Sequence, residues 1–365
     1  MLICAGGTGG GVYPAMTVLD ALGLENESVL WVGSRGGMEE SLVTRRDIPY
    51  KAIPAAGVHG VGLRGLPGNL WELLKGVFAS RRILREFKPN VLLFTGGYVA
   101  IPMAAAAIRW QSLLYVPDIE PGMALKALAK FTDKIALTTE TSSAYFPNKS
   151  KLTVTGYPVR PGLSSWTRED ALAYFDFDPA LPTLCVAGGS KGARSINTAL
   201  VKILPELLAE MQIVHLTGHL DWDFVEANAQ DLPKALAKRY QPFPYLHEMG
   251  AALAAADLIV SRAGASTLGE YPLFGLPSIL VPYPYAWRYQ KVNASYLADR
   301  GAAEILLDEN LDAELYDRVH RLITDKKALS NMGKAMEALA TPDAAERIAK
   351  LLKQLADTPG GGISA

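Results

Sequence analysis

Short apolar runs alternate with helical patterns along most of the chain. In the stretch 14–22, apolar residues recur at i, i+3, i+4 and i+7, which is the spacing of one helix face. Short apolar strands that alternate with helices are typical of a parallel sheet covered on both sides. The predicted strands are 2–5, 29–32, 50–53, 91–94, 112–116, 134–137, 152–154, 183–187, 212–216, 256–261, 278–281 and 303–306. The predicted helices are 14–22 (with Pro14 in its first turn), 193–208, 222–228, 249–255, 266–274, 289–300, 313–322 and 344–355.

The alternation stops at 156–162, a segment rich in Pro and Gly, and then restarts. Such a segment predicts a linker between two domains. We expect an N-terminal domain over 1–157, a C-terminal domain over 163–340, and a helix and tail over 341–365 that pack back on the N-terminal domain. The fold class is α/β, with two doubly wound, Rossmann-like domains that face each other across a cleft and bind ligands outside the carboxyl ends of their strands.

Composition narrows the class of protein. The chain has 365 residues, of which 49% are hydrophobic, enough for two ordinary cores. Its formal net charge of −1 gives no global indication of nucleic-acid binding. Cys4 and Cys185 lie in apolar runs and are expected to be buried thiols of a reducing compartment. The first predicted strand begins at once, and no apolar run reaches the roughly 18–20 residues of a membrane span, so we expect a cytoplasmic protein, soluble or peripheral.

A glycine-rich loop follows the first predicted strand of each half, at 6–11 and at 188–193. Glycine lets the backbone approach a ligand closely, and a helix that begins after the loop directs free N–H groups at it. Both loops therefore predict phosphate binding, with a plain strand–helix turn as the alternative. The first loop is no dinucleotide fingerprint, because Val12 stands where Gly or Ala is needed, and it lacks the Gly-Lys-Ser/Thr of a P-loop.

Two further loops at strand ends carry candidate ligand contacts. The segment 261–270 is rich in small residues and enters a helix, where the Glu270 carboxylate is placed to bind both hydroxyls of a ribose. A capping box that joins Ser266 or Thr267 to Glu270 explains the same residues without a ligand. The segment 282–293 combines Tyr and Trp with amides, which suits a sugar; a rigid Pro/Tyr loop is the alternative.

Seven segments occur in the order typical of the MurG family, which the chain resembles from its first strand to about residue 350. They are Gly-Gly-Thr-Gly-Gly at 6–10, Thr-Gly-Gly-Tyr-Val at 95–99, Gly-Tyr-Pro-Val-Arg at 156–160, and the segments 188–193, 245–249, 261–270 and 275–282. The resemblance implies a GT-B fold and an inverting transfer of GlcNAc from UDP-GlcNAc to lipid-linked muramoyl pentapeptide in peptidoglycan synthesis. It also implies a peripheral location at the cytoplasmic face of the bacterial plasma membrane.

The resemblance further implies roles for individual residues. They are Thr8, Gly9 and Gly10 where donor and acceptor meet; Arg160 and Ser190 at the donor diphosphate; Leu246 and Met249 at the uracil; Ala265, Ser266, Thr267 and Leu268 along the diphosphate; Glu270 at the ribose; and Gln290 at the GlcNAc hydroxyls. UDP-GlcNAc is a substrate, and we expect no cofactor and no metal. The expected partners are UDP-GlcNAc, a lipid-linked acceptor and an anionic membrane surface, without nucleic acid.

The chain departs from the family at three places. Gly11 stands where the family usually has His, Tyr115-Val116-Pro117-Asp118 where it has His-Glu-Gln-Asn, and Trp287 near a usual Asp. With Gly11 in place of His, Asp118 is the candidate general base, and a structural loop carboxylate is the alternative. The departures leave open a transferase with another acceptor and a non-catalytic UDP-sugar-binding envelope protein; an epimerase of similar fold is less favoured by the ordered motifs.

The stretch 66–88 combines an apolar stripe with basic residues. Its proposed membrane residues are Leu70, Trp71, Leu74, Phe78, Arg81, Arg82 and Arg85. Apolar and basic residues on one helix suit an anionic membrane surface. A helix that turns the same stripe toward the protein core is the alternative.

Overall fold

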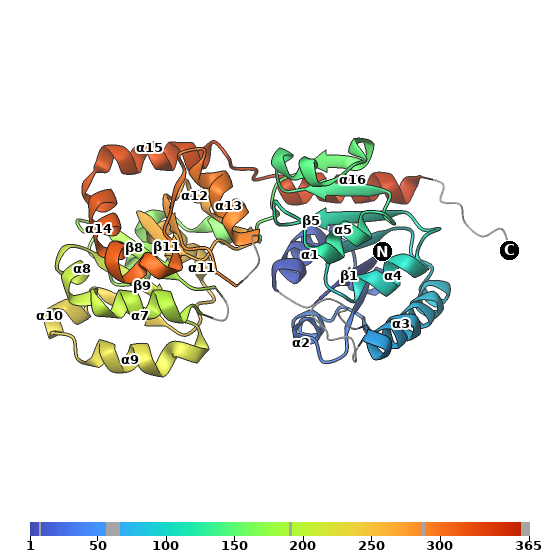
Figure 1. Cartoon of the computed structure of the whole chain (residues 1–365), viewed down its shortest axis with the longest axis horizontal. Helices are drawn as coiled ribbons and strands as arrows, with labels where there is room; N and C mark the ends of the chain where they lie inside the picture. Colours follow the sequence, from blue (N-terminus) through green and yellow to red (C-terminus); the bar gives the residue numbers. More distant parts are fainter. Residues whose placement is uncertain (7–8, 56–65, 190–191, 286–288, 359–365) are drawn as a thin grey trace. The chain divides into compact units, whose positions relative to one another are not determined.

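The computed structural model describes residues 1–6, 9–55, 66–189, 192–285 and 289–358 (Figure 1). The chain divides into two compact units. Unit 1 comprises Met1–Arg160 and Pro342–Ala365, and unit 2 comprises Pro161–Thr341. The boundary after Arg160 lies inside the Pro/Gly segment 156–162, where the alternation of strands and helices is interrupted.

Unit 1 contains a seven-stranded sheet in the order β3-β2-β1-β4-β5-β6-β7, and every strand pair is parallel. The strands are β1 (Leu2–Ala5), β2 (Leu30–Ser34), β3 (Tyr50–Ile53), β4 (Leu92–Gly96), β5 (Ser112–Val116), β6 (Lys134–Leu137) and β7 (Leu152–Val154). All seven predicted strands are confirmed, although β2 and β4 each lie one or two residues further along the chain than predicted.

Helices cover both faces of this sheet. They are α1 (Gly9–Leu22), α2 (Met38–Thr44), α3 (Leu66–Phe87), α4 (Ala100–Ala106), α5 (Met123–Leu128) and α16 (Ala344–Asp357). Along β1, Ile3 packs with α1 and α16, whereas Leu2 and Cys4 pack with α3, α4 and α5. Side chains alternate between the faces of a strand, so a run that is apolar at every position must be covered twice. In Figure 1, α16, in red, lies against unit 1 although it follows unit 2 in the sequence.

The first helix begins earlier than predicted. α1 starts at Gly9, so Pro14 lies inside the helix and not in its first turn. Proline removes the N–H that would bond the carbonyl of Gly10. Gly10 is exposed, so water can reach this part of the helix, and the proline is tolerated.

Unit 2 contains a six-stranded parallel sheet in the order β10-β9-β8-β11-β12-β13. The strands are β8 (Thr183–Ala187), β9 (Gln212–Leu216), β10 (Tyr240–Phe243), β11 (Leu258–Ser261), β12 (Ser278–Leu280) and β13 (Ala303–Ile305). The sequence pattern missed β10, because Gln241 and Pro242 interrupt its apolar run. Proline is tolerated in this strand because β10 is at the edge of the sheet.

The helices of unit 2 differ from prediction at several places, and the three at 168–174, 234–237 and 326–337 were not predicted. The helices of the unit are α6 (Arg168–Tyr174), α7 (Arg194–Lys202), α8 (Leu204–Glu210), α9 (Trp222–Gln230), α10 (Lys234–Ala237), α11 (Met249–Ala255), α12 (Glu270–Phe274), α13 (Tyr289–Ala298), α14 (Leu311–Thr324) and α15 (Lys326–Glu337). The single helix predicted over 193–208 is two helices, since Pro205 starts a new one. The helix predicted over 266–274 is a 3₁₀ turn, η6 (Ala265–Leu268), followed by α12.

The two sheets place their first strands in the same way. In each, the strand order reverses beside the first strand, between β1 and β4 in unit 1 and between β8 and β11 in unit 2. Ligands of doubly wound sheets bind at such a reversal, outside the carboxyl ends of the strands. The glycine-rich loops follow β1 and β8, so each begins at the reversal point of its own sheet.

Candidate active site

In unit 2, the residues expected to contact the donor follow the ends of neighbouring strands. Leu246 and Met249 come after β10, the segment 265–270 after β11, and Gln290 after β12. Because all the strands are parallel, these segments lie together at the carboxyl ends of the strands. Leu246 is buried, and Met249, the first residue of α11, is half-buried. Ser190 lies outside the described residues, and its role stays a prediction.

The segment 265–270 is not a capping box. The N-cap of α12 is Gly269, which has no side chain, and not Ser266 or Thr267. Glu270 is the first residue of the helix. The Thr267 hydroxyl instead donates to the carbonyl of Gly264 at 2.7 Å. The alternative interpretation of Ser266 or Thr267 with Glu270 is therefore wrong. Ala265 and Ser266 are half-buried in η6, whereas Thr267 and Leu268 are buried.

Two amide side chains of α13 hold the loops after β12 and β11, respectively. The backbone N–H of Tyr283 donates to Oε1 of Gln290 at 2.9 Å. Asn293 is fully buried, and its Nδ2 donates to the carbonyl of Ala263 at 3.2 Å. The Oε1 atom of Gln290 is therefore engaged by the backbone of Tyr283, and the role of Gln290 at the GlcNAc hydroxyls stays a prediction. Trp287 lies outside the described residues.

In unit 1, the loop after β1 packs against the loop after β4 through main-chain atoms. Gly97 has φ +87°, and a Cβ there would lie 2.4 Å from the Gly6 carbonyl oxygen. Gly11 is buried: its carbonyl accepts from the Thr95 hydroxyl at 2.7 Å, and a Cβ on it would lie 3.2 Å from the Thr95 carbonyl oxygen. A larger side chain at position 11 would require the β4 main chain to move. Gly10 is exposed, Gly9 begins α1, and Thr8 lies outside the described residues.

Asp118 follows β5 by two residues and is half-buried. Tyr115, which stands where the family usually has His, is fully buried, and its hydroxyl bonds Oγ1 of Thr138 at 2.8 Å. Burial, together with Tyr157 and Asp118, raises the pKa of Tyr115 well above its ordinary value. Tyr115 is therefore a protonated core residue, and Asp118 remains the candidate base at this strand end.

The sequence pattern missed Glu120, a second carboxylate of the same loop. Glu120 is only 3% exposed, and its Oε1 accepts from Nζ of Lys126 at 3.3 Å. Lys126 also lies 5.3 Å from the ring centroid of Tyr145. The acidic residue two positions after Asp118, just before Pro121 and Gly122, was the signal that could have identified it.

Arg160 is the last residue of the first segment of unit 1 and is half-buried. Its guanidinium lies 5.5 Å from the ring centroid of Tyr13, on α1. A cation over an aromatic face is held in place without losing its charge. The guanidinium is thus positioned beside the helix that follows the first glycine-rich loop.

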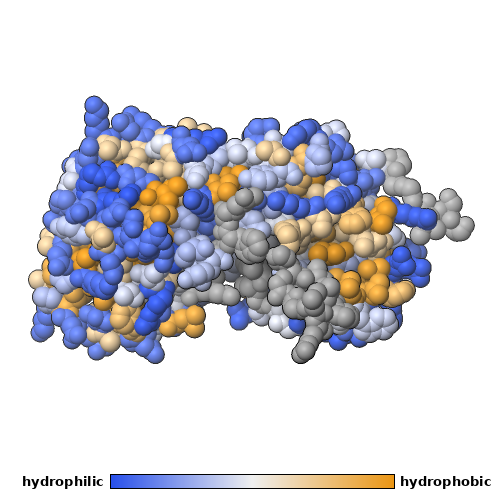
Figure 2. Space-filling view, viewed as in Figure 1, coloured by the Kyte–Doolittle hydropathy of each residue, from blue (hydrophilic) through white to orange (hydrophobic). Residues whose placement is uncertain are grey.

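The apolar stripe of α3 faces solvent. Leu70, Trp71, Leu74 and Phe78 have exposed fractions of 50–67%, whereas Gly76, Ser80, Ile83 and Leu84 are buried. Leu70, Leu74 and Phe78 therefore do not face the core, whereas Leu73 and Val77 of the same stripe are half-buried. Figure 2 shows hydrophobic surface over the region of α3. The basic residues Arg81, Arg82 and Arg85 are exposed too, and Arg82 pairs with Glu86 at 2.7 Å.

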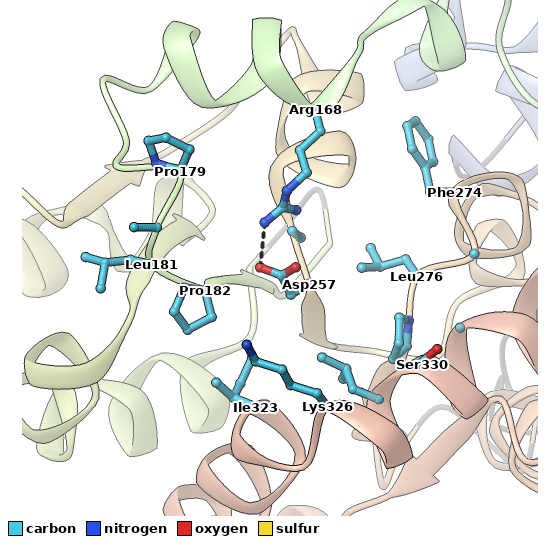
Figure 3. Close-up of a pocket in the computed structure, with 16 residues that line it drawn as sticks. Arg168, Pro179, Leu181, Pro182, Asp257, Phe274, Leu276, Ile323, Lys326 and Ser330 are labelled. Carbon is cyan, nitrogen blue, oxygen red and sulfur yellow. Dashed lines mark hydrogen bonds and ion pairs between the residues drawn. The ribbon is translucent and has the colours of Figure 1, made fainter.

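A cavity of about 480 Å³ lies at the amino ends of the strands of the unit 2 sheet (Figure 3). Its lining residues Pro182, Asp257 and Pro277 immediately precede β8, β11 and β12. Arg168 crosses it and bonds Oδ2 of Asp257 at 2.8 Å. Because the ends of parallel strands point the same way, this cavity is opposite the loops of the candidate donor site.

The part of the chain that the structure describes contains neither a metal site nor a membrane-spanning helix. Among the described residues, no group of three or more His, Cys, Asp or Glu side chains is arranged to hold a metal ion. No helix of the described segments is long and apolar enough to cross a membrane.

Two doubly wound sheets with glycine-rich loops at their strand ends are typical of nucleotide-sugar glycosyltransferases with two Rossmann-like domains. Comparison with known proteins supports this class. Residues 1–137 match the glycosyltransferase family 28 N-terminal domain, and residues 183–348 match the glycosyltransferase family 28 C-terminal domain. The chain thus has the two Rossmann-like domains of a GT-B glycosyltransferase.

Relatives over the full length narrow the class. A Roseiflexus sp. protein is 38% identical and a Desulforamulus reducens protein 37%, each over 97% of this chain and covering 94% and 98% of the relative. Both are named UDP-N-acetylglucosamine–N-acetylmuramyl-(pentapeptide) pyrophosphoryl-undecaprenol N-acetylglucosamine transferase. The chain belongs to the MurG family.

Solved structures show the same fold. The crystal structure of Acinetobacter baumannii MurG matches 97% of this chain and 99% of its own, with a TM-score of 0.75 and 27% identity. A UDP-GlcNAc 2-epimerase from Neisseria meningitidis has a TM-score of 0.64 at 12% identity, over 97% of this chain and 99% of its own. The second likeness concerns the fold alone.

Proposed function

We propose that the chain transfers GlcNAc from UDP-GlcNAc to lipid-linked muramoyl pentapeptide, the step from lipid I to lipid II of peptidoglycan synthesis. The observation that carries this proposal is the full-length relationship to transferases named for that reaction. The strand-end loops of unit 2 support it, since they gather small, apolar and hydrogen-bonding residues at the carboxyl ends of the strands.

We assign the donor to unit 2. Leu246 and Met249 bracket the uracil, Glu270 binds the ribose hydroxyls, and Gln290 binds the GlcNAc hydroxyls. Ser190 and the segment 265–268 line the diphosphate, together with Arg160 from unit 1. Hydrogen-bond donors that are fixed in advance stabilise the charge that develops on UDP as it leaves, and such stabilisation supplies much of the rate enhancement of many enzymes.

We assign the chemistry to unit 1. An acceptor hydroxyl attacks C1 of GlcNAc, the C1–O bond to phosphate breaks, UDP leaves with the electron pair, and the anomeric centre inverts. Asp118 takes the proton of the attacking hydroxyl, a contribution of about 10²–10⁴-fold. Thr8, Gly9 and Gly10 face the reacting groups, where small residues leave room for a bulky acceptor.

We place α3 on an anionic membrane at the cytoplasmic face. Leu70, Leu74, Phe78, Arg81 and Arg85 are spaced by four, four, three and four residues, so they share one helix face, and all five are exposed. An apolar face bordered by basic residues binds through buried apolar area and attraction to anionic lipid.

Vesicle co-sedimentation tests this membrane face. Leu74→Ser with Phe78→Ser should lower binding to anionic vesicles by at least tenfold, since each buried apolar side chain contributes about 1.5–3 kcal/mol. Leu24→Ser, at another exposed position of unit 1, should leave binding unchanged. Equal binding of the double variant and the wild type would show that α3 does not contact the membrane.

UDP release with and without lipid-linked muramoyl pentapeptide tests the reaction itself. We expect release only with that acceptor, and the same rate in the presence of EDTA. A second candidate, transfer to a different acceptor, is favoured by the replacement of the usual His at Gly11 and Tyr115. Turnover with another lipid-linked or free sugar, but not with muramoyl pentapeptide, would select it. Tight UDP binding without release to any acceptor would indicate a non-catalytic protein.

A further inference from the structure

Two aspartates far apart in the sequence bond to the first turn of α7, directly after the glycine-rich loop 188–193. Asp221 is the last residue of the turn η5 (His219–Asp221), which follows β9, and Asp308 is the first of η7 (Asp308–Asn310), which follows β13. Since β9 and β13 lie on opposite sides of β8 in the sheet, the two aspartates reach α7 from opposite sides.

Asp221 holds α7 through two side chains. Its Oδ1 accepts from Arg194 at 2.7 Å, and its Oδ2 accepts from Nδ2 of Asn197 at 2.8 Å. The second hydrogen of that amide goes to the carbonyl of Thr217 at 2.9 Å. Both Asp221 and Asn197 are buried, at 6% and 0% exposed. Hydrogen bonds to a buried carboxylate are stronger than those between neutral groups.

Asp308 holds α7 through Ser195. Its Oδ1 accepts from the Ser195 hydroxyl at 2.8 Å and also from Nη1 of Arg262. The other nitrogen of that guanidinium donates to the Ser195 oxygen at 2.8 Å, so the three side chains form a closed triangle. The Arg262 side chain is only 10% exposed, and it also donates to the carbonyl of Val281 at 3.2 Å. The triangle therefore joins α7 to the loops after β11, β12 and β13.

A buried histidine completes the Asp221 side. Nε2 of His215 bonds Oδ1 of Asn197 at 2.9 Å, and its Nδ1 bonds the Tyr240 hydroxyl at 2.7 Å. Because both amide hydrogens of Asn197 are donated elsewhere, its oxygen must accept, so the histidine is protonated on Nε2 and accepts on Nδ1. The amide of Asn197 thus has one orientation, which fixes the first turn of α7.

The glycine-rich loop rests on the same main chain. Gly192 has φ +79°, and a Cβ there would lie 2.3 Å from the Thr217 carbonyl oxygen, the atom that Asn197 also bonds. The end of the loop and the start of α7 therefore share one support. Each aspartate is also paired with an arginine, Arg194 or Arg262, so its charge is offset and does not repel an anion at the helix start.

We propose that Asp221 and Asp308 are positioning residues for the donor diphosphate, acting through Asn197, Ser195 and Arg262 on the start of α7 and on Gly192 before it. The inference rests on the proposed donor site of unit 2. Neither carboxylate binds the donor. Their role is to fix the N–H groups at the start of α7 before the ligand arrives, which removes an ordering cost from binding.

The decisive variants separate positioning from folding. Ser195→Ala removes the link to α7 but leaves the pair of Arg262 with Asp308, and alanine favours a helix. Asp308→Asn keeps an acceptor for Ser195 but loses the charge. The control is Asp312→Asn, which removes a surface pair with Lys202 in which both side chains are more than half exposed.

The full chain is measured by calorimetric titration with UDP and by steady-state kinetics. We expect Ser195→Ala and Asp308→Asn to raise the Kd for UDP and the KM for UDP-GlcNAc about tenfold, with the acceptor KM and kcat within about twofold of wild type. The double variant should be little worse than Asp308→Asn, because both changes break one triangle. Asp312→Asn should match the wild type.

Two results would overturn the inference, and they are distinguishable. If the wild type binds UDP and Ser195→Ala binds it equally well, the aspartate network only supports the fold, whatever Asp308→Asn does to Tm. If the wild type itself does not bind UDP, the donor site proposed for unit 2 fails, and the inference fails with it.

Discussion

The two units have the same central strand order but stabilise their strand-end loops differently. In unit 2, side chains join the loops, as in the triangle of Ser195, Arg262 and Asp308. In unit 1, the loops after β1 and β4 meet mainly through main-chain atoms, with Gly97 against Gly6 and the Thr95 hydroxyl on the Gly11 carbonyl. One frame therefore supports two kinds of loop, and the difference lies in the residues that follow each strand.

The contrast matches the proposed substrates. A nucleotide sugar is small and rich in hydrogen-bonding groups, so fixed side chains in unit 2 suit it. A lipid-linked acceptor is large and partly apolar, so small residues near Gly10 and the exposed apolar face of α3 suit unit 1. Under the proposed function, unit 2 recognises most of the donor, and unit 1 carries the chemistry and the membrane contact.

The largest expected effect tests the division of labour. Asp118→Asn should lower kcat by about 10²–10⁴-fold and leave the Kd for UDP unchanged, because the general base is lost while the donor site in unit 2 is intact. UDP release and calorimetric titration measure the two quantities. Asp20→Asn, which breaks a surface pair with Arg46, is the control and should behave as wild type.

One outcome would assign the role of general base to another residue of the same loop. If Asp118→Asn keeps full turnover and Glu120→Gln abolishes it, the buried Glu120 is the base and Asp118 is a structural carboxylate. Loss of UDP binding in Asp118→Asn would instead contradict the division between the units.

The next effect belongs to unit 2. Glu270→Gln should raise the KM for UDP-GlcNAc about 100-fold and leave the acceptor KM unchanged, since a charged hydrogen bond to a ribose contributes about 1.5–3 kcal/mol. Competition with UDP and with uracil alone locates the loss: UDP affinity should fall, and uracil affinity should not. An unchanged KM for UDP-GlcNAc would exclude Glu270 from the donor site.

Acid should weaken unit 2 before unit 1. Burial lowers the pKa of His215 from 6.5 to about 3, so the folded protein holds it neutral between Asn197 and Tyr240. Because the folded pKa is the lower one, this stabilisation is complete above pH 6.5 and is lost as pH falls toward 3. From pH 8 to pH 5 the loss is about 2 kcal/mol, roughly 30-fold in the unfolding equilibrium constant.

Hydrogen exchange followed by fragment separation at both pH values would measure this difference. Amides of β9 and α7 should lose protection at pH 5 more than those of β1 and β4. The variant His215→Gln, whose amide can bond both partners but does not titrate near neutral pH, should reduce the difference. Equal loss in both units would contradict the expectation.

The smallest effect concerns the charges of α3. Arg81→Gln and Arg85→Gln should each weaken binding to anionic vesicles about fivefold, since one basic residue near such a surface contributes about 1 kcal/mol. Arg82→Gln should matter less, because Arg82 already pairs with Glu86. Added salt should remove the difference among the three variants. A larger loss for Arg82→Gln would reverse the assigned face.

Much of the fold followed from the sequence. Every stretch predicted as a strand, such as 2–5, 112–116 and 183–187, overlaps a strand of the structure, because a doubly covered strand is apolar at every position and short. The strand that this pattern missed was β10, whose Pro242 is tolerated at a sheet edge, a property of position that no local pattern contains.

The candidate site was predictable only in part. The loops at 188–193 and 261–270 were identifiable because small residues directly after an apolar strand are a local signal. The direction of the α3 stripe was not, since an apolar helix face is the same in sequence whether it meets a core or a membrane. Only the exposed fractions in the folded structure show that Leu74 and Phe78 face solvent.

The sequence by itself determined twelve of the thirteen strands of the structure, the two α/β halves and the positions of their glycine-rich loops, because each depends on residues within a few positions of one another. Only the tertiary structure decided that Tyr115 is a core residue, that Gly11 packs on Thr95, and that Asp308 bonds Ser195 across 113 residues. These contacts depend on which strands become neighbours in the sheet, and that is a property of the whole unit.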